Sequence, residues 1–258
     1  MKCLTLRAVV GLSIVLVGWE SCAAILQGSA TAPSSYTVAT DSNALIANLS
    51  SAGSVDWAYW SSALGASAPG TPTNSKLSAT PIGSITSIGA GTLRGSSSTN
   101  VNGRFTYTDG TSPTASTAPG QAITGLFNET LNTNNVGVSL PISLPTTDTY
   151  LITLWVSGFN ATGAMTASLT GATNYTDSSL AFQGTKNAGY YTFLAKADTA
   201  GDTLTLNYVT ASNSNASSHV LIAAATVAIA PIPEPSTFAV LAFGAISCAA
   251  YGLRRFRA

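Results

Sequence analysis

Apolar and polar residues alternate with a period of two in several segments of this chain. In the clearest segment, Leu204, Leu206 and Tyr208 fall on one side, and hydroxyl or amide residues separate them. The segment Met165–Leu169 repeats the pattern. Because successive side chains of a strand point to opposite faces, both segments predict strands with one buried and one wet face.

Longer apolar segments predict further strands. Tyr150–Val156 and Tyr190–Leu194 are apolar on both sides, which is typical of central strands. Val136–Leu144 contains Pro141, which predicts an edge strand or a bent one because proline has no backbone N–H. A last long strand is predicted over His219–Ile229.

The first part of the body is less regular. Strands are predicted at Ser34–Ala39, Asp56–Trp60 and Arg104–Thr108, and Asp109–Pro113 forms a strong turn signal. No helical period and no internal repeat is found between the two ends. Many short strands separated by turn residues predict an all-β fold, with a jelly-roll or β-sandwich body.

The N-terminus has the pattern of a secretory signal peptide. Lys2 and Arg7 form a basic region, Ala8–Val17 an apolar helical core, and small residues around Cys22 offer a cleavage site. We therefore predict a signal peptide over residues 1–23. A second interpretation is a lipoprotein signal in which Cys22 carries the lipid.

Two unlike elements follow one another near the C-terminus. The motif Pro233-Glu234-Pro235 favours extended backbone, so that neither a helix nor a central strand runs through it. The apolar run Thr237–Leu253 would span roughly 25 Å as a helix, against roughly 30 Å of bilayer hydrocarbon. It is predicted to be a marginal transmembrane helix, which suits a temporary anchor.

A basic end completes this pattern. Arg254 and Arg255 follow the apolar run and would hold the tail on the cytoplasmic side. The order of the three parts resembles the PEP-CTERM sorting signal, a family of bacterial C-terminal tags. The resemblance implies recognition by an exosortase, a membrane-embedded cysteine transpeptidase-like enzyme, in bacteria that make exopolysaccharide. An ordinary tail-anchor helix is the alternative interpretation.

These features divide the chain into a signal peptide (1–23), an exported β-sandwich domain (24–231) and a sorting and anchor segment (232–258). All three cysteines lie in the targeting segments, so the mature body contains no disulfide. The body carries five Lys and Arg residues against eight Asp and Glu residues. No basic patch is present for nucleic acid, whose binding depends on clustered Lys and Arg.

Several short phrases of the body also resemble a galactose-binding-like module of secreted bacterial and fungal proteins. They are Asp56–Trp60, Phe105–Gly110, Tyr150–Val156, Ala167–Leu169 and Gly201–Leu204. The resemblance implies a jelly-roll β-sandwich of the kind often found beside carbohydrate-active domains. It assigns no ligand to particular residues.

The aromatic segment is the candidate binding site. Trp57, Tyr59 and Trp60 could stack on sugar rings, and Asp56 could accept hydrogen bonds from sugar hydroxyls. The alternative is core packing, because Trp57 and Tyr59 share one side of a strand and Trp60 lies on the other. Since a sandwich strand has one inner face, we expect one of the two sets, and Trp60 rather than Trp57 and Tyr59, to be at least partly exposed.

Catalytic and metal-binding patterns are weak. Turn aspartates such as Asp109, Asp177, Asp198 and Asp202 could hold Ca²⁺, but such residues usually cap their own backbone. Glycoside hydrolysis requires two facing carboxylates, and nothing in the spacing pairs them. A lone histidine, His219, supports neither a serine triad nor a zinc site. We predict no cofactor, no metal and no enzymatic activity.

The sequence therefore predicts an exported protein, tethered to the inner membrane during sorting by exosortase and then held at the cell surface or in the extracellular matrix. Its predicted role is structural or adhesive, near exopolysaccharide. A carbohydrate-binding module is the first alternative, and a secreted glycan hydrolase is the second.

Overall fold

The computed structural model describes residues 23–35, 46–78, 81–96, 103–182 and 187–231. The predicted signal peptide up to residue 22 and the predicted sorting segment lie outside these residues. Within them the fold is all-β, as predicted, with one helical turn, α1 (Leu49–Ala52). None of the described helices is long and apolar enough to cross a membrane.

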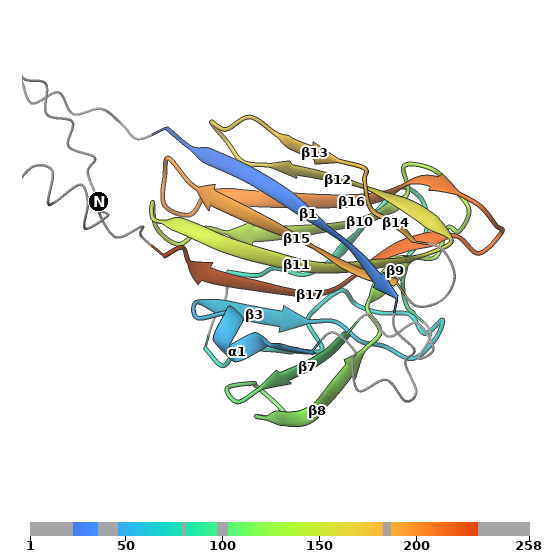
Figure 1. Ribbon diagram of the computed structural model, residues 1–258, viewed down its shortest axis with the longest axis horizontal. Helices are drawn as coiled ribbons and strands as arrows, with labels where there is room; N and C mark the ends of the chain where they lie inside the picture. The colour runs from blue at the N-terminus through green and yellow to red at the C-terminus, as the bar shows by residue number, and fades with distance from the viewer. Residues whose placement is uncertain (1–22, 36–45, 79–80, 97–102, 183–186, 232–258) are drawn as a thin grey trace, which may run out of the picture.

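The large sheet forms one layer of the molecule (Figure 1). Its strands in spatial order are β1 (Ile25–Ser35), β15 (Asn187–Lys196), β11 (Thr149–Phe159), β17 (His219–Ile229), β3 (Asp56–Tyr59) and β4 (Asn74–Ser75). Beside this path, β9 (Leu126–Asn128) pairs with both β17 and β6 (Leu93–Gly95). The predicted central strands of Tyr150–Val156 and Tyr190–Leu194 do lie inside the sheet, as β11 and β15.

The opposite sheet forms the second layer. Its strands in spatial order are β13 (Tyr175–Asp177), β12 (Ala161–Ser168), β16 (Thr203–Asn213), β10 (Gly137–Ser143) and β5 (Thr86–Ile88), and β14 (Ala181–Phe182) also pairs with β12. The accessory sheet is smaller and contains β2 (Ile46–Asn48), β7 (Gly103–Tyr107) and β8 (Ser116–Ile123).

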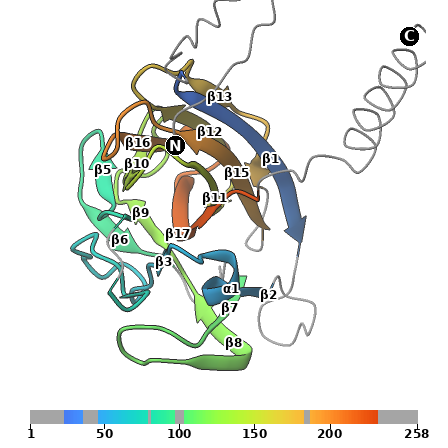
Figure 2. The same cartoon turned by 90° about the vertical axis from the view of Figure 1, so that its left-hand side faces the viewer.

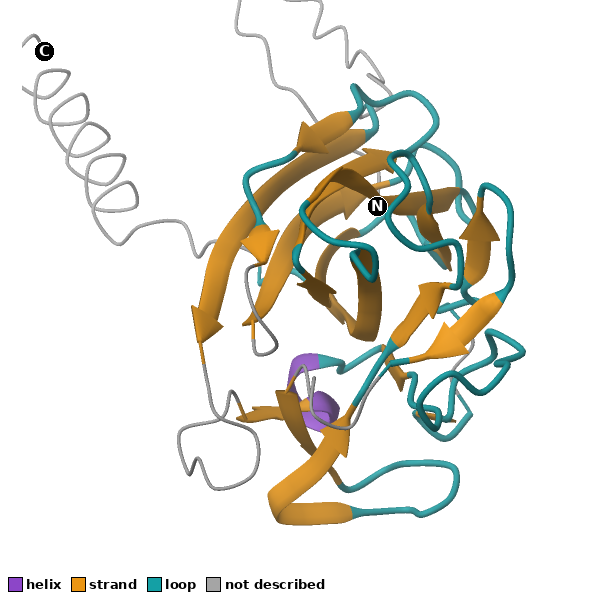
Figure 3. Ribbon diagram, turned by 90° about the vertical axis from the view of Figure 1, so that its right-hand side faces the viewer, coloured by secondary structure: helices purple, strands orange, loops and turns teal. Residues whose placement is uncertain are grey.

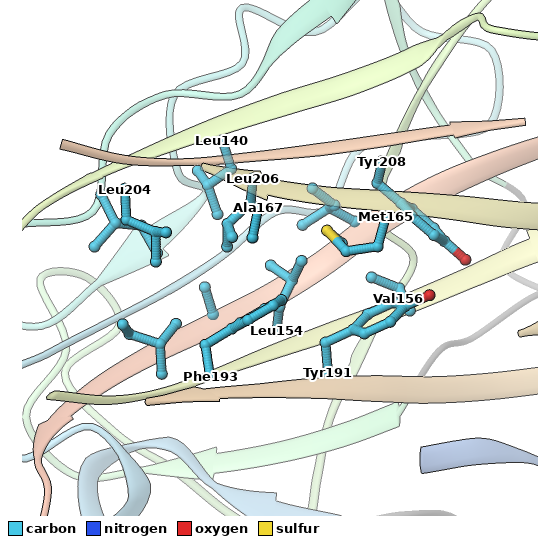
Figure 4. Close-up of a cluster of buried hydrophobic side chains, with 14 of the residues drawn as sticks. Leu140, Leu154, Val156, Met165, Ala167, Tyr191, Phe193, Leu204, Leu206 and Tyr208 are labelled. Carbon is cyan, nitrogen blue, oxygen red and sulfur yellow. The ribbon is translucent and has the colours of Figure 1, made fainter. Parts of the chain in front are cut away.

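The main core lies between the large and opposite sheets. Figure 4 shows Leu206 of β16 pointing toward Leu154 of β11, and Tyr208 of β16 pointing toward Tyr191 of β15. All four side chains are completely buried, which confirms the predicted one-sided burial of the strand that contains Leu204. Two antiparallel sheets with their apolar faces together are consistent with a β-sandwich.

The chain changes sheets repeatedly from β10 onward. It runs from β10 to β11 in the large sheet, to β12 and β13 in the opposite sheet, back to β15, and then through β16 to β17. Viewed from the two ends, the layers curve around the shared core, and β7 and β8 lie outside them (Figures 2 and 3).

A second core lies on the outer side of the large sheet. There Trp57 and Tyr59 of β3 and Trp155 of β11 pack against Phe105 and Tyr107 of β7. Phe105 meets Trp155 edge to face, with ring centroids 5.4 Å apart. The accessory sheet therefore covers part of a sheet face that would otherwise lie in water.

Proline 141 explains the position of β10 near the edge of the opposite sheet. Antiparallel pairing with β16 places Pro141 opposite Thr205. On its other side, the Pro141 carbonyl accepts a hydrogen bond from the Gly83 amide at 2.9 Å. The N–H that proline lacks would point to this same side, away from β16. The backbone hydrogen bonds between β10 and β16 therefore stay intact.

Candidate functional site

The aromatic segment Asp56–Trp60 is buried on both sides. Trp57, Tyr59 and Trp60 are at most 1% exposed, so the prediction that Trp60 is exposed is wrong. The accessory sheet covers Trp57 and Tyr59, while Trp60 faces the main core and donates its ring N–H to the Gly70 carbonyl at 2.8 Å. No ring face of this segment is therefore open to stack on a sugar.

Asp56 is also buried, with 2% of its surface exposed. Its carboxylate accepts hydrogen bonds from the backbone amides of Trp57 (2.8 Å) and Ile82 (2.9 Å). Burial raises the pKa of Asp56 to about 6, although both amide donors oppose the shift. These bonds connect β3 to the segment around Ile82 and leave Asp56 inaccessible to a sugar hydroxyl.

Asp109 joins the accessory sheet to the large sheet. It accepts the Trp57 ring N–H at 2.7 Å, forms an ion pair with Lys76 at 2.8 Å and bonds to the Ser50 hydroxyl. Partial burial raises its pKa, but the hydrogen bonds from Lys76, Ser50 and Trp57 outweigh that effect and hold the pKa below its usual range. Asp109 therefore has a structural role within the fold.

The remaining catalytic candidates also have structural partners. Glu129 binds Arg94 at 2.6 Å and accepts bonds from the Thr92 amide and hydroxyl. His219 stacks on Phe127, with centroids 4.1 Å apart, and its Nδ1 lies 2.8 Å from the Ser217 carbonyl. Burial lowers the pKa of His219, which favours the neutral ring. Among the described residues, no group of three or more His, Cys, Asp or Glu side chains could hold a metal ion.

The outward surface of the opposite sheet carries mainly hydroxyl and amide side chains, and we call it the hydroxyl face. Cross-strand register aligns one outward side chain from each of five neighbouring strands: Thr176 of β13, Thr166 of β12, Asn207 of β16, Ser139 of β10 and Thr86 of β5. Since neighbouring strands lie about 4.8 Å apart, this row extends over roughly 20 Å.

The hydroxyl face is uncharged and its row is not used to hold the fold together. In the described strands of this sheet, Asp177 alone carries a charge, and it belongs to the edge strand β13. None of the five row side chains makes a hydrogen bond to another described residue.

A hollow of about 540 Å³ lies at the β12–β13 end of the hydroxyl face. It is lined by Ala164, Met165, Thr166, Thr176, Asp177, Ser178 and Ser179. The hollow is shallow and open to solvent rather than enclosed. This hollow and the row beside it form the candidate site.

Sequence reasoning missed this site for a physical reason. The alternation in each strand predicts which side chains face water, but the register that aligns Thr166 with Thr176 and Asn207 depends on pairing between distant segments. The sequence marks Asp177 only as a turn residue. The available signal was the absence of charge from every outward position of these strands.

The chain matches no family model, and a search of curated proteins finds none that is significantly similar to it.

Proposed function

We propose that this chain is an exported, exosortase-processed protein with a structural or adhesive role at the cell surface or in the extracellular matrix, near exopolysaccharide. The hydroxyl face is the observation that carries the adhesive role. Over five strands it presents a row of uncharged hydroxyl and amide side chains that make no side-chain hydrogen bond within the described part of the chain. Export and sorting rest on the two ends of the sequence, including Pro233-Glu234-Pro235 and Arg254-Arg255.

The chemistry of the hydroxyl face favours a neutral polysaccharide partner. A protein interface would need a core enriched in aromatic residues, Met and Arg, whereas Ser is depleted at such interfaces. Nucleic acid would need Lys and Arg to neutralise phosphates. Neutral glycans offer many hydroxyl groups, which pair with Thr, Ser and Asn side chains and need no counter-charge.

The body belongs in this proposal to the jelly-roll group of β-sandwiches. The strand orders β3-β17-β11-β15 and β13-β12-β16-β10, together with the repeated changes of sheet, support that topology. The contacts of Asp109 and Glu129 with neighbouring side chains favour a binding or structural role over hydrolysis.

Retention on the host's own matrix tests the adhesive role. Asn207→Lys combined with Ser139→Lys places two charges in the centre of the hydroxyl face. Both side chains point outward, so the fold should persist. We expect this variant to wash off the matrix at salt concentrations that leave the wild type bound.

A matched control carries the same charges elsewhere. Ser29→Lys combined with Thr31→Lys changes exposed positions of the edge strand β1 in the other sheet. This control should bind like the wild type. Equal retention of all three proteins would show that the hydroxyl face does not adhere to the matrix.

A further inference from the structure

The edge strand β1 differs from the other edge strands of the described sheets. It has 11 residues, whereas β2, β4, β5, β6, β13 and β14 have two or three and the longer β8 contains Pro119. From Ile25 to Thr31, β1 carries no charge and no proline, and its register with β15 has no shift. Natural sheet edges are usually short, charged, bulged or interrupted by proline, because these features prevent pairing with another chain. This stretch of β1 lacks all of them.

Hydrogen bonds in the large sheet fix the direction in which each residue of β1 points its backbone groups. In a strand, the N–H and C=O of one residue point to the same edge, and those of the next residue point to the opposite edge. The Ala230 amide, directly after β17, donates to the Thr149 carbonyl, so Thr149 faces β17 and Tyr150 faces β15. Tyr150 pairs with Ala195, and the neighbouring residue of β15, Leu194, therefore faces β1.

This alternation leaves three residues of β1 with backbone groups that face away from the sheet. Leu194 pairs with Gln27, so Gln27 faces β15. Its neighbours Leu26 and Gly28, and likewise Ala30, face the open edge. Within the described part of the chain, no hydrogen bond reaches the backbone groups of these three residues. The open edge of β1 therefore has the alternating donors and acceptors with which a further strand would pair.

Apolar side chains at this edge are only partly buried. Leu26 and Ala30 point inward, and together with Tyr175 of β13 they pack against the main core. The Tyr175 ring lies over Gly28, where an added Cβ would be 2.7 Å from it. A second molecule placed against the open edge would cover these side chains further, which favours association because apolar surface leaves water.

The sequence of β1 is suited to pairing with a second copy of itself. With two copies antiparallel about Gly28, the two glycines face each other, and Leu26 of each copy lies opposite Ala30 of the other. A large side chain then meets a small one on the inner side. On the outer side, Gln27 lies opposite Ser29, and these two exposed polar side chains can form a hydrogen bond. Because neither strand carries a charge in this stretch, the pairing brings no like charges together.

We propose that the chain forms a two-fold symmetric dimer in which the β1 strands of two copies pair antiparallel and join their large sheets into one. The backbone groups of Leu26, Gly28 and Ala30 supply the hydrogen bonds, as in strand addition at other open sheet edges. The same patch serves both copies, as a two-fold interface requires. The dimer goes beyond the proposed function and does not rest on it, because each copy keeps its own hydroxyl face on the opposite sheet.

Light scattering after size-exclusion chromatography of the full-length chain in detergent tests the dimer. We expect the wild type to have the mass of two chains at micromolar concentration. Ala30→Pro removes an N–H that faces the open edge and leaves the bonds to β15 intact, so this variant should be monomeric with native far-UV circular dichroism. It does not change the apolar run Thr237–Leu253, so loss of the dimer could not be attributed to that segment.

A proline at another sheet edge is the matched control. Ser139 of β10 points its backbone groups to the same side as Pro141, toward β5, and it pairs with Thr86. Thr86 therefore faces β10, and the next residue, Ser87, faces the open edge of β5. Ser87→Pro removes an edge-facing N–H in the opposite sheet and should stay dimeric.

Disulfide trapping tests the register. The natural Cys3, Cys22 and Cys248 are replaced by Ser, and one sample carries Gln27→Cys while another carries Ser29→Cys. In the proposed pairing these two positions lie opposite each other, with Cα atoms about 4.5 Å apart, which a disulfide can bridge. Two copies of Gln27→Cys would lie diagonally, with Cα atoms about 8 Å apart, which is too far. After mixing and oxidation with oxidised glutathione, the disulfide between positions 27 and 29 should predominate.

Each result decides for or against the dimer. A wild type that stays monomeric throughout the micromolar range overturns the proposal, and so does a folded Ala30→Pro variant that remains dimeric. Cross-linking of Gln27→Cys to itself as readily as to Ser29→Cys also overturns it, and this arm decides if Ala30→Pro fails to fold. None of these measurements uses the host matrix, so the dimer and the adhesive role can fail independently.

Discussion

Two core tyrosines differ in whether their hydroxyl groups have partners. The Tyr191 hydroxyl donates to Asp177 at 3.1 Å, whereas the buried Tyr208 hydroxyl has no partner among the described residues. A buried polar group without a partner costs roughly 1–3 kcal/mol, and a bond to a charged group contributes roughly 1.5–3 kcal/mol. The two hydroxyl groups therefore have opposite effects on the free energy of unfolding.

Paired Tyr→Phe substitutions measure this difference. Tyr208→Phe should leave the free energy of unfolding unchanged or raise it by up to about 3 kcal/mol, while Tyr191→Phe should lower it by about 1.5–3 kcal/mol. Urea unfolding of the two variants provides the measurement. Equal destabilisation by both would mean that the Tyr208 hydroxyl has a partner after all.

Asp56 makes stability depend on pH in an unusual direction. Because burial raises its pKa to about 6, the folded state holds the proton more tightly than the unfolded state, in which the pKa is near 3.8. Protonation therefore favours folding. The stabilisation from Asp56 is complete below about pH 4 and is lost as the pH rises through about 6, a change of about 3 kcal/mol.

Comparison with Asp56→Asn isolates this contribution. The difference in unfolding free energy between wild type and variant should fall as the pH rises from about 4 to above 6. Asp109 acts in the opposite direction, since its lowered pKa is linked to stability that is lost as the pH falls, but this contribution cancels in the difference. A difference that stays constant with pH would contradict the raised pKa of Asp56.

At the scale of elements, strands in which apolar and polar residues alternate strongly can be predicted from the sequence. The segments that cover each face of such a strand cannot. The strand with Leu204, Leu206 and Tyr208 follows from its sequence because its inner side is continuously apolar. Trp60 was predicted to be exposed because a sheet in a simple sandwich has one covered face. The accessory sheet covers the other face too, and the residues that form it, such as Phe105 and Tyr107, are far away in sequence.

The edge strand β1 was missed for a different reason. It begins at Ile25, before the predicted start at Ser34. Its inward positions include small residues such as Gly28, where an added Cβ would lie 2.7 Å from the Tyr175 ring. The aromatic side chain from β13 fills this space, so β1 itself lacks the strong apolar alternation by which strands are recognised.

Removal of Phe105 tests how the accessory sheet is attached. Phe105 is completely buried and contacts Trp155 edge to face, so Phe105→Ala should lower the free energy of unfolding by about 3–5 kcal/mol. It should also shift the tryptophan fluorescence of the folded protein to longer wavelength, because water gains access to Trp57 and Trp155.

Leu206→Ala is the matched control in the main core. It should cost about 2–5 kcal/mol without exposing Trp57 and Trp155 to water, because Leu206 lies on the other side of the large sheet from the accessory sheet. If Phe105→Ala has native-like fluorescence, the accessory sheet does not protect these tryptophans.

At the scale of the whole molecule, apolar burial and hydrogen bonding provide most of the cohesion, and charge contributes little. The two ion pairs between described residues, Lys76–Asp109 and Arg94–Glu129, are partly exposed, and such pairs typically contribute at most about 1 kcal/mol. The body has no cysteine between residues 24 and 231. In the proposed location outside the cell, neither salt nor redox conditions would alter the core of such a body.

The proposed sorting event predicts a shorter mature chain. In the sequence, Pro233-Glu234-Pro235 separates the folded body, whose last strand ends at Ile229, from the apolar run Thr237–Leu253. Processing at this break would release the body from its temporary anchor without disturbing β17, since the strand is paired on both sides before the motif begins.

Intact-mass analysis of protein from the native host should therefore show a chain that ends near Glu234 or Ser236. The control is the same gene with Pro233 and Pro235 replaced by Ala, which should keep the full C-terminus because the break is lost and the apolar helix can extend into the motif. A mature wild-type chain that retains Arg254, Arg255 and Arg257 would favour a plain tail anchor. In that case the β-sandwich would stay at the inner membrane, and the extracellular adhesive role would have to be abandoned.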